Sequence, residues 1–109
     1  MESSVEPMAL ARELANGVIV RLLDVRQPEE FALAALPNAR LIPLNRLDNC
    51  IDELLDWQEE NVVVYCHHGI RSLHATRWLQ QQGFSTVRNL VGGIDAWSIE
   101  VDPAISRYH

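Results

Sequence analysis

One short segment holds most of the residues that could do chemistry, and its single thiol is the candidate nucleophile. The segment reads Cys66, His67, His68, Gly69, Ile70, Arg71 and Ser72. It leaves a strongly apolar stretch and enters one with helical spacing, so the N–H groups at the start of that helix point back at the loop. Gly69 permits the backbone angles with which N–H groups curl inward as an anion nest, and Arg71 adds a fixed positive charge. The pattern therefore predicts a stabilised thiolate at Cys66.

The same cysteine has a plainer interpretation, because a lone Cys after a strand is more often a small core residue. Its surroundings favour chemistry: a Gly three positions later, an Arg five later, a Ser six later and the start of a helix. The length of the loop then limits which reactions the cysteine could catalyse. Cysteine-type protein phosphatases place five residues between nucleophile and arginine, whereas only residues 67–70 separate Cys66 from Arg71. A cradle this small suits a single sulfur atom better than a phosphate.

Alternating strand and helix signals surround this loop and predict an α/β domain. Apolar, β-branched runs predict strands at residues 18–25, 40–42, 61–65 and 86–90. Helical spacing and capping residues predict helices at 7–15, 28 to about 35, 48–58, 72–82 and 94–98. This alternation implies a parallel sheet of about five strands with helices on both faces. Because ligands bind beyond the carboxyl ends of such strands, the loops after Val25 and Tyr65 are singled out.

Length and charge limit the classes of protein that the chain can represent. Its 109 residues fit one domain, with a core of about 8–98 and a C-terminal tail at 99–109. The net charge of −6 argues against nucleic acid or an anionic membrane as the main partner. No apolar run approaches the ~20 residues of a membrane span, no leader opens the chain, and two cysteines are few for a disulfide-built secreted domain. We therefore expect a cytoplasmic protein.

Several further motifs, taken in order, are specific to one family. They are residues 22–26 with 28–31, 36–39 with 42–44, 62–66 with Gly69, Arg71 and Ser72, and 89–97, which hold Gly-Gly-x-x-Ala-Trp. With these motifs the sequence resembles the rhodanese-like single-domain sulfurtransferases over nearly its whole length. A shorter and weaker similarity links residues 101–103 and 107–108 to rhodanese domains fused to sulfur-carrier-activating enzymes.

The resemblance implies a double-displacement cycle with Cys66 as the catalytic residue. Cys66 would take the outer sulfur of a small anionic donor, such as thiosulfate or a persulfide, and pass it to cyanide, a thiol or a protein acceptor. A protein can also be the donor. The amides of 67–71 would hold the persulfide, and Arg71 would orient anionic donors. The expected substrate-binding residues are therefore His67, His68, Gly69, Ile70, Arg71 and Ser72. The family's Asp-Val-Arg motif falls on Asp24 and Arg26, which are expected to brace the active loop.

The chain departs from the family in one turn. Where the family commonly has Gly-His-Ile-Pro-Gly-Ala, residues 34–39 read Ala-Ala-Leu-Pro-Asn-Ala. Because Asn tolerates left-handed backbone angles, we expect Asn38 to preserve the turn. Ala35 stands where the family has an imidazole, so any role of that group is absent or is filled by His67 or His68. The preferred donor is therefore left open.

A few other side chains have two interpretations each. His67 and His68 could tune the site, since a protonated imidazole favours anionic donors, or they could be exposed loop side chains. No metal site is expected, because adjacent histidines seldom converge on one ion. Cys50 is interpreted as core or partly exposed filler, with a resolving thiol for Cys66 as the alternative. No nucleotide, haem or flavin fingerprint is present in the sequence, and no cofactor is expected.

Two other functions fit a cysteine loop on this fold. A small phosphatase or arsenate reductase would use the same thiolate, but the short loop speaks against it. A non-catalytic docking domain would need no nucleophile, and the intact Cys66 and Arg71 speak against that.

Overall fold

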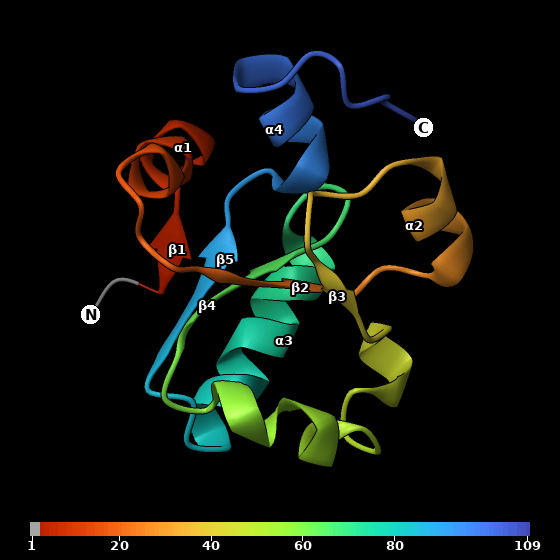
Figure 1. Ribbon diagram of the computed structural model, residues 1–109. Helices are drawn as coiled ribbons and strands as arrows, with labels where there is room; N and C mark the ends of the chain where they lie inside the picture. Colours follow the sequence, from red (N-terminus) through yellow and green to blue (C-terminus); the bar gives the residue numbers. More distant parts are fainter. Residues whose placement is uncertain (1–2) are drawn as a thin grey trace.

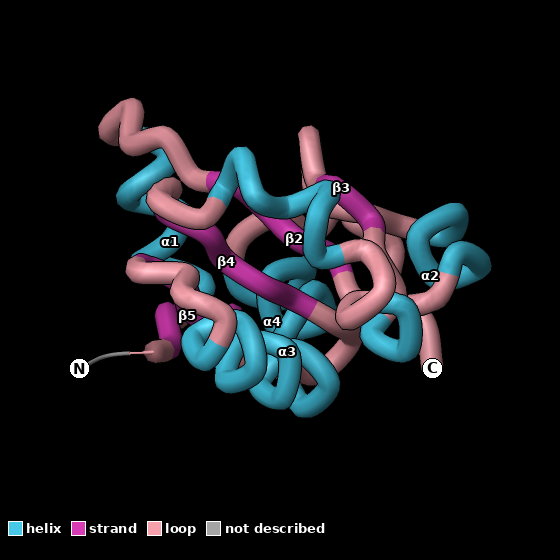
Figure 2. Tube along the Cα trace, turned by 90° about the horizontal axis from the view of Figure 1, so that it is seen from below, coloured by secondary structure: helices cyan, strands magenta, loops and turns pink. Residues whose placement is uncertain are grey.

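Five strands form one sheet in the computed structural model, which describes residues 3–109. The strands are β1 (Ser4–Val5), β2 (Arg21–Asp24), β3 (Arg40–Leu41), β4 (Asn61–Tyr65) and β5 (Thr86–Leu90). All pairs are parallel in the order β1-β5-β4-β2-β3, so β4 is central with β2 and β5 beside it (Figure 1, Figure 2). The predicted α/β class with about five parallel strands is confirmed.

Helices cover both faces of the sheet, as parallel strands require. They are α1 (Pro7–Ala15), α2 (Pro28–Leu33), α3 (Ile70–Gln81) and α4 (Gly93–Glu100), with 3₁₀ segments η1 (Leu44–Arg46) and η2 (Ile51–Trp57). Figure 1 shows α1 and α4 above the sheet and α3 below it, with the C-terminus close to α2. None of the helices between residues 3 and 109 is long and apolar enough to cross a membrane.

The pleat of β4 decides which way the candidate nucleophile points. Alternate residues of a strand face opposite sides of the sheet. Val62 and Val64 pack in the core cluster that contains residues of α3 and η2, and Cys66 continues this alternation into the same cluster. Val63 and Tyr65 pack on the other face with residues of α1 and α4. The side chain of Cys66 is therefore directed toward the face from which α3 approaches.

Three predicted elements have the bounds that the pattern indicated, and two predictions were wrong. Helix 7–15 and strands 61–65 and 86–90 are confirmed. The strand predicted at 18–25 is only Arg21–Asp24, because its pairing with β4 starts at Arg21 and leaves Val18 and Ile19 exposed. The helix predicted at 48–58 is the 3₁₀ segment η2. There the backbone N–H groups bond to carbonyls three residues back, as from Glu53 to Cys50 at 2.9 Å and from Gln58 to Leu55 at 3.2 Å, which is the 3₁₀ pattern.

The remaining differences concern element ends and one short strand. The helix predicted from 28 to about 35 ends at Leu33, and the helix predicted from 72 already starts at Ile70. The last helix is longer than 94–98, and the strand at 40–42 is one residue shorter. The fifth strand, β1, was not located from the sequence, because its two residues form a strand only by pairing with β5.

The turn that departs from the family keeps its shape. Asn38 has φ of 65°, in the left-handed region, and the N–H of Ala39 donates to the carbonyl of Leu36 at 3.3 Å. The expectation that asparagine would preserve this turn is confirmed.

We expect Asn38→Ala to lower the free energy of unfolding by about 1 kcal/mol, because a Cβ without a local polar group disfavours left-handed angles. Asn38→Gly should change it by less than about 0.5 kcal/mol, since glycine adopts these angles freely but loses more entropy on folding. Urea denaturation of the two variants measures both values. An equal loss of unfolding free energy in both variants would contradict the left-handed backbone angle as the reason for Asn38.

Candidate active site

The sulfur of Cys66 is enclosed by the loop of residues 66–72, called the active loop below. Only 1% of Cys66 is exposed, and its Sγ accepts hydrogen bonds from the N–H of Gly69 at 3.1 Å and of Ser72 at 3.3 Å. The hydroxyl of Ser72 also lies 3.3 Å from Sγ. The loop amides thus turn toward the sulfur, although the residue is buried. This arrangement can hold a sulfur anion by backbone dipoles and by the N-terminus of α3.

Gly69 and Asn89 together set the shape of the active loop. Gly69 precedes α3 with φ of 97°, and a Cβ there would meet the backbone of Gly92 at 3.1 Å. Behind the loop, the buried Asn89 of β5 donates from Nδ2 to the carbonyl of Gly69 at 3.2 Å. Its Oδ1 accepts a short hydrogen bond from the hydroxyl of Ser72. The sequence did not indicate this role of Asn89. The signal it offers is an amide side chain inside a predicted strand, next to apolar Leu90.

The N-terminus of α4 holds the other side of the loop. The N–H of Ile94 donates to the carbonyl of Cys66 at 2.9 Å, and that of Asp95 to the carbonyl of His67 at 3.1 Å. Gly93, with φ of 63°, allows this approach, because a Cβ would collide with both carbonyl oxygens. The Gly92-Gly93 pair of the Gly-Gly-x-x-Ala-Trp motif therefore packs against the active loop.

Arg71 does not stand alone beside the sulfur, because Glu30 of α2 binds it. The two terminal nitrogens of its guanidinium group donate to the two Glu30 oxygens at 2.7 and 2.9 Å. This hydrogen bonding lowers the pKa of Glu30 to about 2. It also raises the pKa of Arg71, to which the negative charges of Glu30 and Cys66 contribute. The sequence pattern gave no indication of this pairing.

Asp24 and Arg26, the expected braces, form a fully buried ion pair at 2.7 Å. Burial alone would lower the pKa of Arg26, but hydrogen bonds to Asp24 and Tyr108 outweigh it and raise the pKa. Arg26 also donates to the carbonyl of Glu30 at 3.4 Å and to that of Ala34 at 2.6 Å. The pair therefore holds α2 and the C-terminal tail, which in turn contact the active loop. In the described residues it has no hydrogen bond to the loop itself.

The C-terminal tail reaches the site through Tyr108. Its hydroxyl accepts from Arg26 at 2.9 Å and donates to Glu30 at 2.7 Å, while its ring stacks on His67 with centroids 3.9 Å apart. Burial raises the pKa of Tyr108 to about 12. The sequence pattern of the tail gave no indication of this contact, apart from the weak family similarity at residues 107–108.

The two histidines lie on the outside of the loop. His67 is sandwiched between Tyr108 and His68, and burial followed by the neighbouring His68 lowers its pKa. Its Nε2 is buried without a hydrogen-bond partner in the described chain, which also disfavours protonation. A charged His67 that attracts anionic donors is therefore disfavoured. His68 is more exposed and lies 3.8 Å from Asp95.

Ligand atoms of His67, His68 and Asp95 lie within 4.8 Å of one another. The geometry is poor for a shared ion, because imidazole nitrogens bind metals in the ring plane and these two rings are stacked 26° apart. Asp95 is moreover bound by Arg107 at 2.8 Å.

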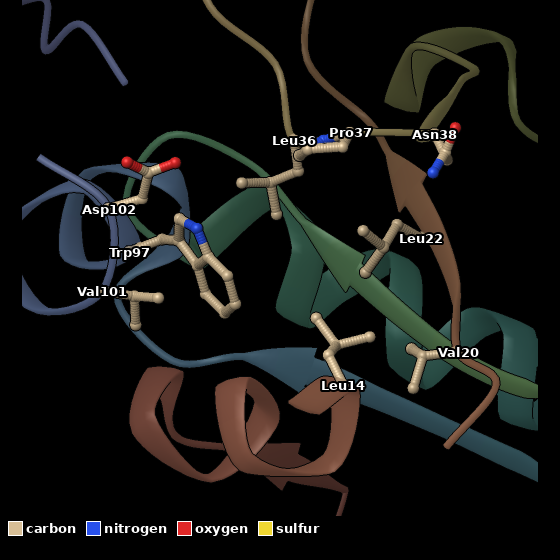
Figure 3. Close-up of a pocket in the computed structure, with 9 residues that line it drawn as sticks. All are labelled: Leu14, Val20, Leu22, Leu36, Pro37, Asn38, Trp97, Val101 and Asp102. Atoms are coloured by element: carbon tan, nitrogen blue, oxygen red, sulfur yellow. The ribbon is translucent and has the colours of Figure 1, made fainter. Parts of the chain in front are cut away.

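Two surface hollows lie away from the sulfur. One, of about 300 Å³, lies between α1, α4 and β2 and is lined by Leu14, Val20, Leu22, Leu36, Pro37, Asn38, Trp97, Val101 and Asp102 (Figure 3). This hollow lies on one face of the sheet, whereas the core cluster that contains Cys66 lies on the opposite face. The other lies between η1 and α3 and is lined by residues that include His74 and Trp78. Neither hollow is lined by Cys66.

Cys50 is partly buried and packs against the core cluster that contains Cys66. Burial raises the pKa of its thiol, which disfavours a thiolate. The interpretation as partly exposed filler agrees with this position, and the role of resolving thiol stays a prediction.

The fold is shared with known proteins. A sequence model described as rhodanese-like domain matches residues 6–100. The chain belongs to this family, and the resemblance seen in the sequence is confirmed.

Two curated relatives and one solved structure illustrate the match. Rhodanese-like/PpiC domain-containing protein 12, chloroplastic, from Arabidopsis thaliana is 39% identical over 90 residues, 81% of this chain but 30% of that protein. A sulfurtransferase from Allochromatium vinosum is 36% identical over 98 residues, 90% of both chains. The crystal structure of a rhodanese-like domain protein from Staphylococcus aureus has a TM-score of 0.82 and 28% identity, covering 100% of both chains. The chain thus spans less than a third of the first relative and most of the second.

The contact between α4 and the active loop yields a test. We expect Gly93→Ala to lower the free energy of unfolding by about 2–4 kcal/mol, because left-handed strain adds to a collision with two carbonyl oxygens. Gly17→Ala is the matched control: Gly17 has φ of 81°, but a Cβ there meets nothing within 4 Å. Gly17→Ala should lower the free energy of unfolding by about 1 kcal/mol, through backbone strain alone. Equal losses in urea denaturation would rule out the close approach as the reason for Gly93.

The pairing of Glu30 predicts a pH effect on stability. Its pKa of about 2 lies below the ordinary 4.5, so its contribution is complete above the unfolded-state pKa and is lost as pH falls toward 2. We expect Glu30→Gln to be less stable than wild type at neutral pH, by at most about 3 kcal/mol, and to match it near pH 2. Denaturation between pH 2 and 7 measures this. Glu29→Gln, at an exposed residue, is the control. A stability difference between wild type and Glu30→Gln that persists at pH 2 would show that the ion pair is not the cause of that difference.

Proposed function

We propose that the protein is a sulfurtransferase of the rhodanese type that carries sulfur on Cys66. The observation that carries the proposal is the pair of backbone N–H groups, from Gly69 and Ser72, that donate to Sγ inside a six-residue loop from Cys66 to Arg71. Backbone donors that stabilise a thiolate also stabilise the terminal sulfur of a persulfide, since both are sulfur anions. Family membership and the sulfurtransferase from Allochromatium vinosum support the same reaction.

The proposed cycle has two displacements at sulfur. In the first, the Cys66 thiolate attacks the outer sulfur of the donor, a new S–S bond forms, and the donor's bond to that sulfur breaks. From an organic persulfide the leaving group is the thiolate of the parent thiol, and from thiosulfate it is sulfite. In the second, a thiolate or cyanide attacks the outer sulfur of the Cys66 persulfide, and Sγ leaves with the electron pair as a thiolate.

The residues of the active loop have different roles in this proposal. The amides of residues 67–71 hold the outer sulfur, and the Ser72 amide stays on Sγ. The hydroxyl of Ser72 donates its hydrogen to Asn89 instead. Arg71 faces the entering donor only to the extent that Glu30 releases it. Ile70, of which 69% is exposed, offers an apolar contact to a protein donor or acceptor. Asp24 and Arg26 act indirectly by holding α2 and the tail.

The alternative reactions have less support. A phosphatase of the cysteine type needs an arginine turned into a larger loop, whereas both outer nitrogens of Arg71 bind Glu30 here. A purely docking role would give no reason for two amides to converge on a buried sulfur. The expectation of a cytoplasmic location stays a prediction.

Intact-mass spectrometry tests the proposal. After incubation with thiosulfate or an alkyl persulfide, the wild-type chain should gain the mass of one sulfur atom and lose it on addition of cyanide with release of thiocyanate. Cys66→Ala should gain none, while Cys50→Ser, the control for the other thiol, should behave as wild type. An equal gain in Cys66→Ala, or hydrolysis of aryl phosphates without any sulfur gain, would refute the proposal.

A further inference from the structure

The three guanidinium groups around the active loop all have carboxylate partners. Arg71 pairs with Glu30, Arg26 with Asp24, and Arg107 with Asp95. A cation whose field is cancelled by an anion at hydrogen-bond distance attracts a third charge weakly. The side chains at the site therefore supply little net positive charge to an incoming donor.

Glu30 is fixed in this position by three segments of the chain. Its two oxygens accept from Arg71, from the backbone N–H of Gln27 at 3.0 Å and from the hydroxyl of Tyr108 at 2.7 Å. The Glu30 side chain is 19% exposed, and its pKa of about 2 keeps it ionised at neutral pH. The carboxylate is thus a permanent part of the site.

His67 does not replace the cancelled charge. His67 is stacked between two rings and partly buried, its pKa is lowered by burial and by His68, and its buried Nε2 would have no acceptor for a proton in the described chain. The attraction that remains comes from the inward amides and the N-terminus of α3, whose dipole is equivalent to roughly half a positive charge. Such a cradle suits one negative charge on sulfur and leaves a second charge, such as that of a sulfonate, uncompensated.

We propose that Glu30 is a specificity-determining residue: by neutralising Arg71 it makes the site prefer monoanionic organic persulfides over dianionic thiosulfate as sulfur donors. This inference rests on the proposed sulfurtransferase function. Glu30 acts through Arg71 and does not touch the donor.

The test compares two donors in Glu30→Gln. Glutamine keeps the size of the side chain and one oxygen, which can still accept from the N–H of Gln27, but removes the charge and the second oxygen, to which Tyr108 donates. We expect kcat/KM with thiosulfate to rise about tenfold, mainly through a lower KM, because Arg71 becomes available. With the persulfide of 2-mercaptoethanol, which carries one charge, the rise should stay below about threefold. Thiocyanate release with cyanide as the common acceptor measures both.

Glu29→Gln is the matched control. Glu29 is the neighbouring residue of α2 and is exposed, and its substitution removes the same charge as Glu30→Gln. It should leave the ratio of the two kcat/KM values unchanged. In Glu30→Gln the gain with thiosulfate should also shrink at high ionic strength, as attraction by an exposed cation does.

A second measurement needs no variant. In the wild type, kcat/KM with thiosulfate should depend little on salt and stay below the value for the persulfide. A steep fall with salt, a wild-type preference for thiosulfate, or an unchanged donor ratio in Glu30→Gln would overturn the inference. Absence of any Cys66 persulfide from both donors would instead overturn the proposed function.

Discussion

The rest of the site depends on the hydrogen bonds that two backbone amides donate to the sulfur of Cys66. A sulfur anion inside a protein loses its water and is stable only where dipoles replace it. Gly69 and Ser72 supply these dipoles from 3.1 and 3.3 Å. Because the donors belong to the backbone, their placement is a property of the loop's path rather than of a flexible side chain. Burial of Cys66 and stabilisation of its anion are therefore compatible.

Keeping the loop on this path requires contacts from elements far away in the sequence. Asn89 of β5 binds the carbonyl of Gly69, and the first amides of α4 bind the carbonyls of Cys66 and His67. Both elements follow α3 in the chain, but the parallel sheet returns them to the same edge as β4. The carbonyls of Cys66, His67 and Gly69 thus have hydrogen-bond donors.

This division between local and distant contacts explains what the sequence could predict. The strand before Cys66 and the glycine after it follow from local patterns, and the fold class follows from their alternation. The partners Glu30, Asn89 and Tyr108 could not be derived, because their roles arise from pairings across 41, 17 and 78 positions. The strand β1 and the 3₁₀ form of η2 were missed for a similar reason, since neither has a strong local pattern.

The side chains around the loop have a different task from its backbone. Asp24, Arg26, Glu30, Arg71 and Tyr108 form one connected set of hydrogen bonds that joins β2, α2, α3 and the tail. In this set each positive charge meets a negative one, so it adds rigidity without adding net charge. The backbone can then determine that a sulfur anion is held, while the charge balance of the set determines which donors approach. A change in this outer set can therefore alter donor preference without dismantling the cradle, whereas a change in Gly69 or Gly93 alters the cradle itself.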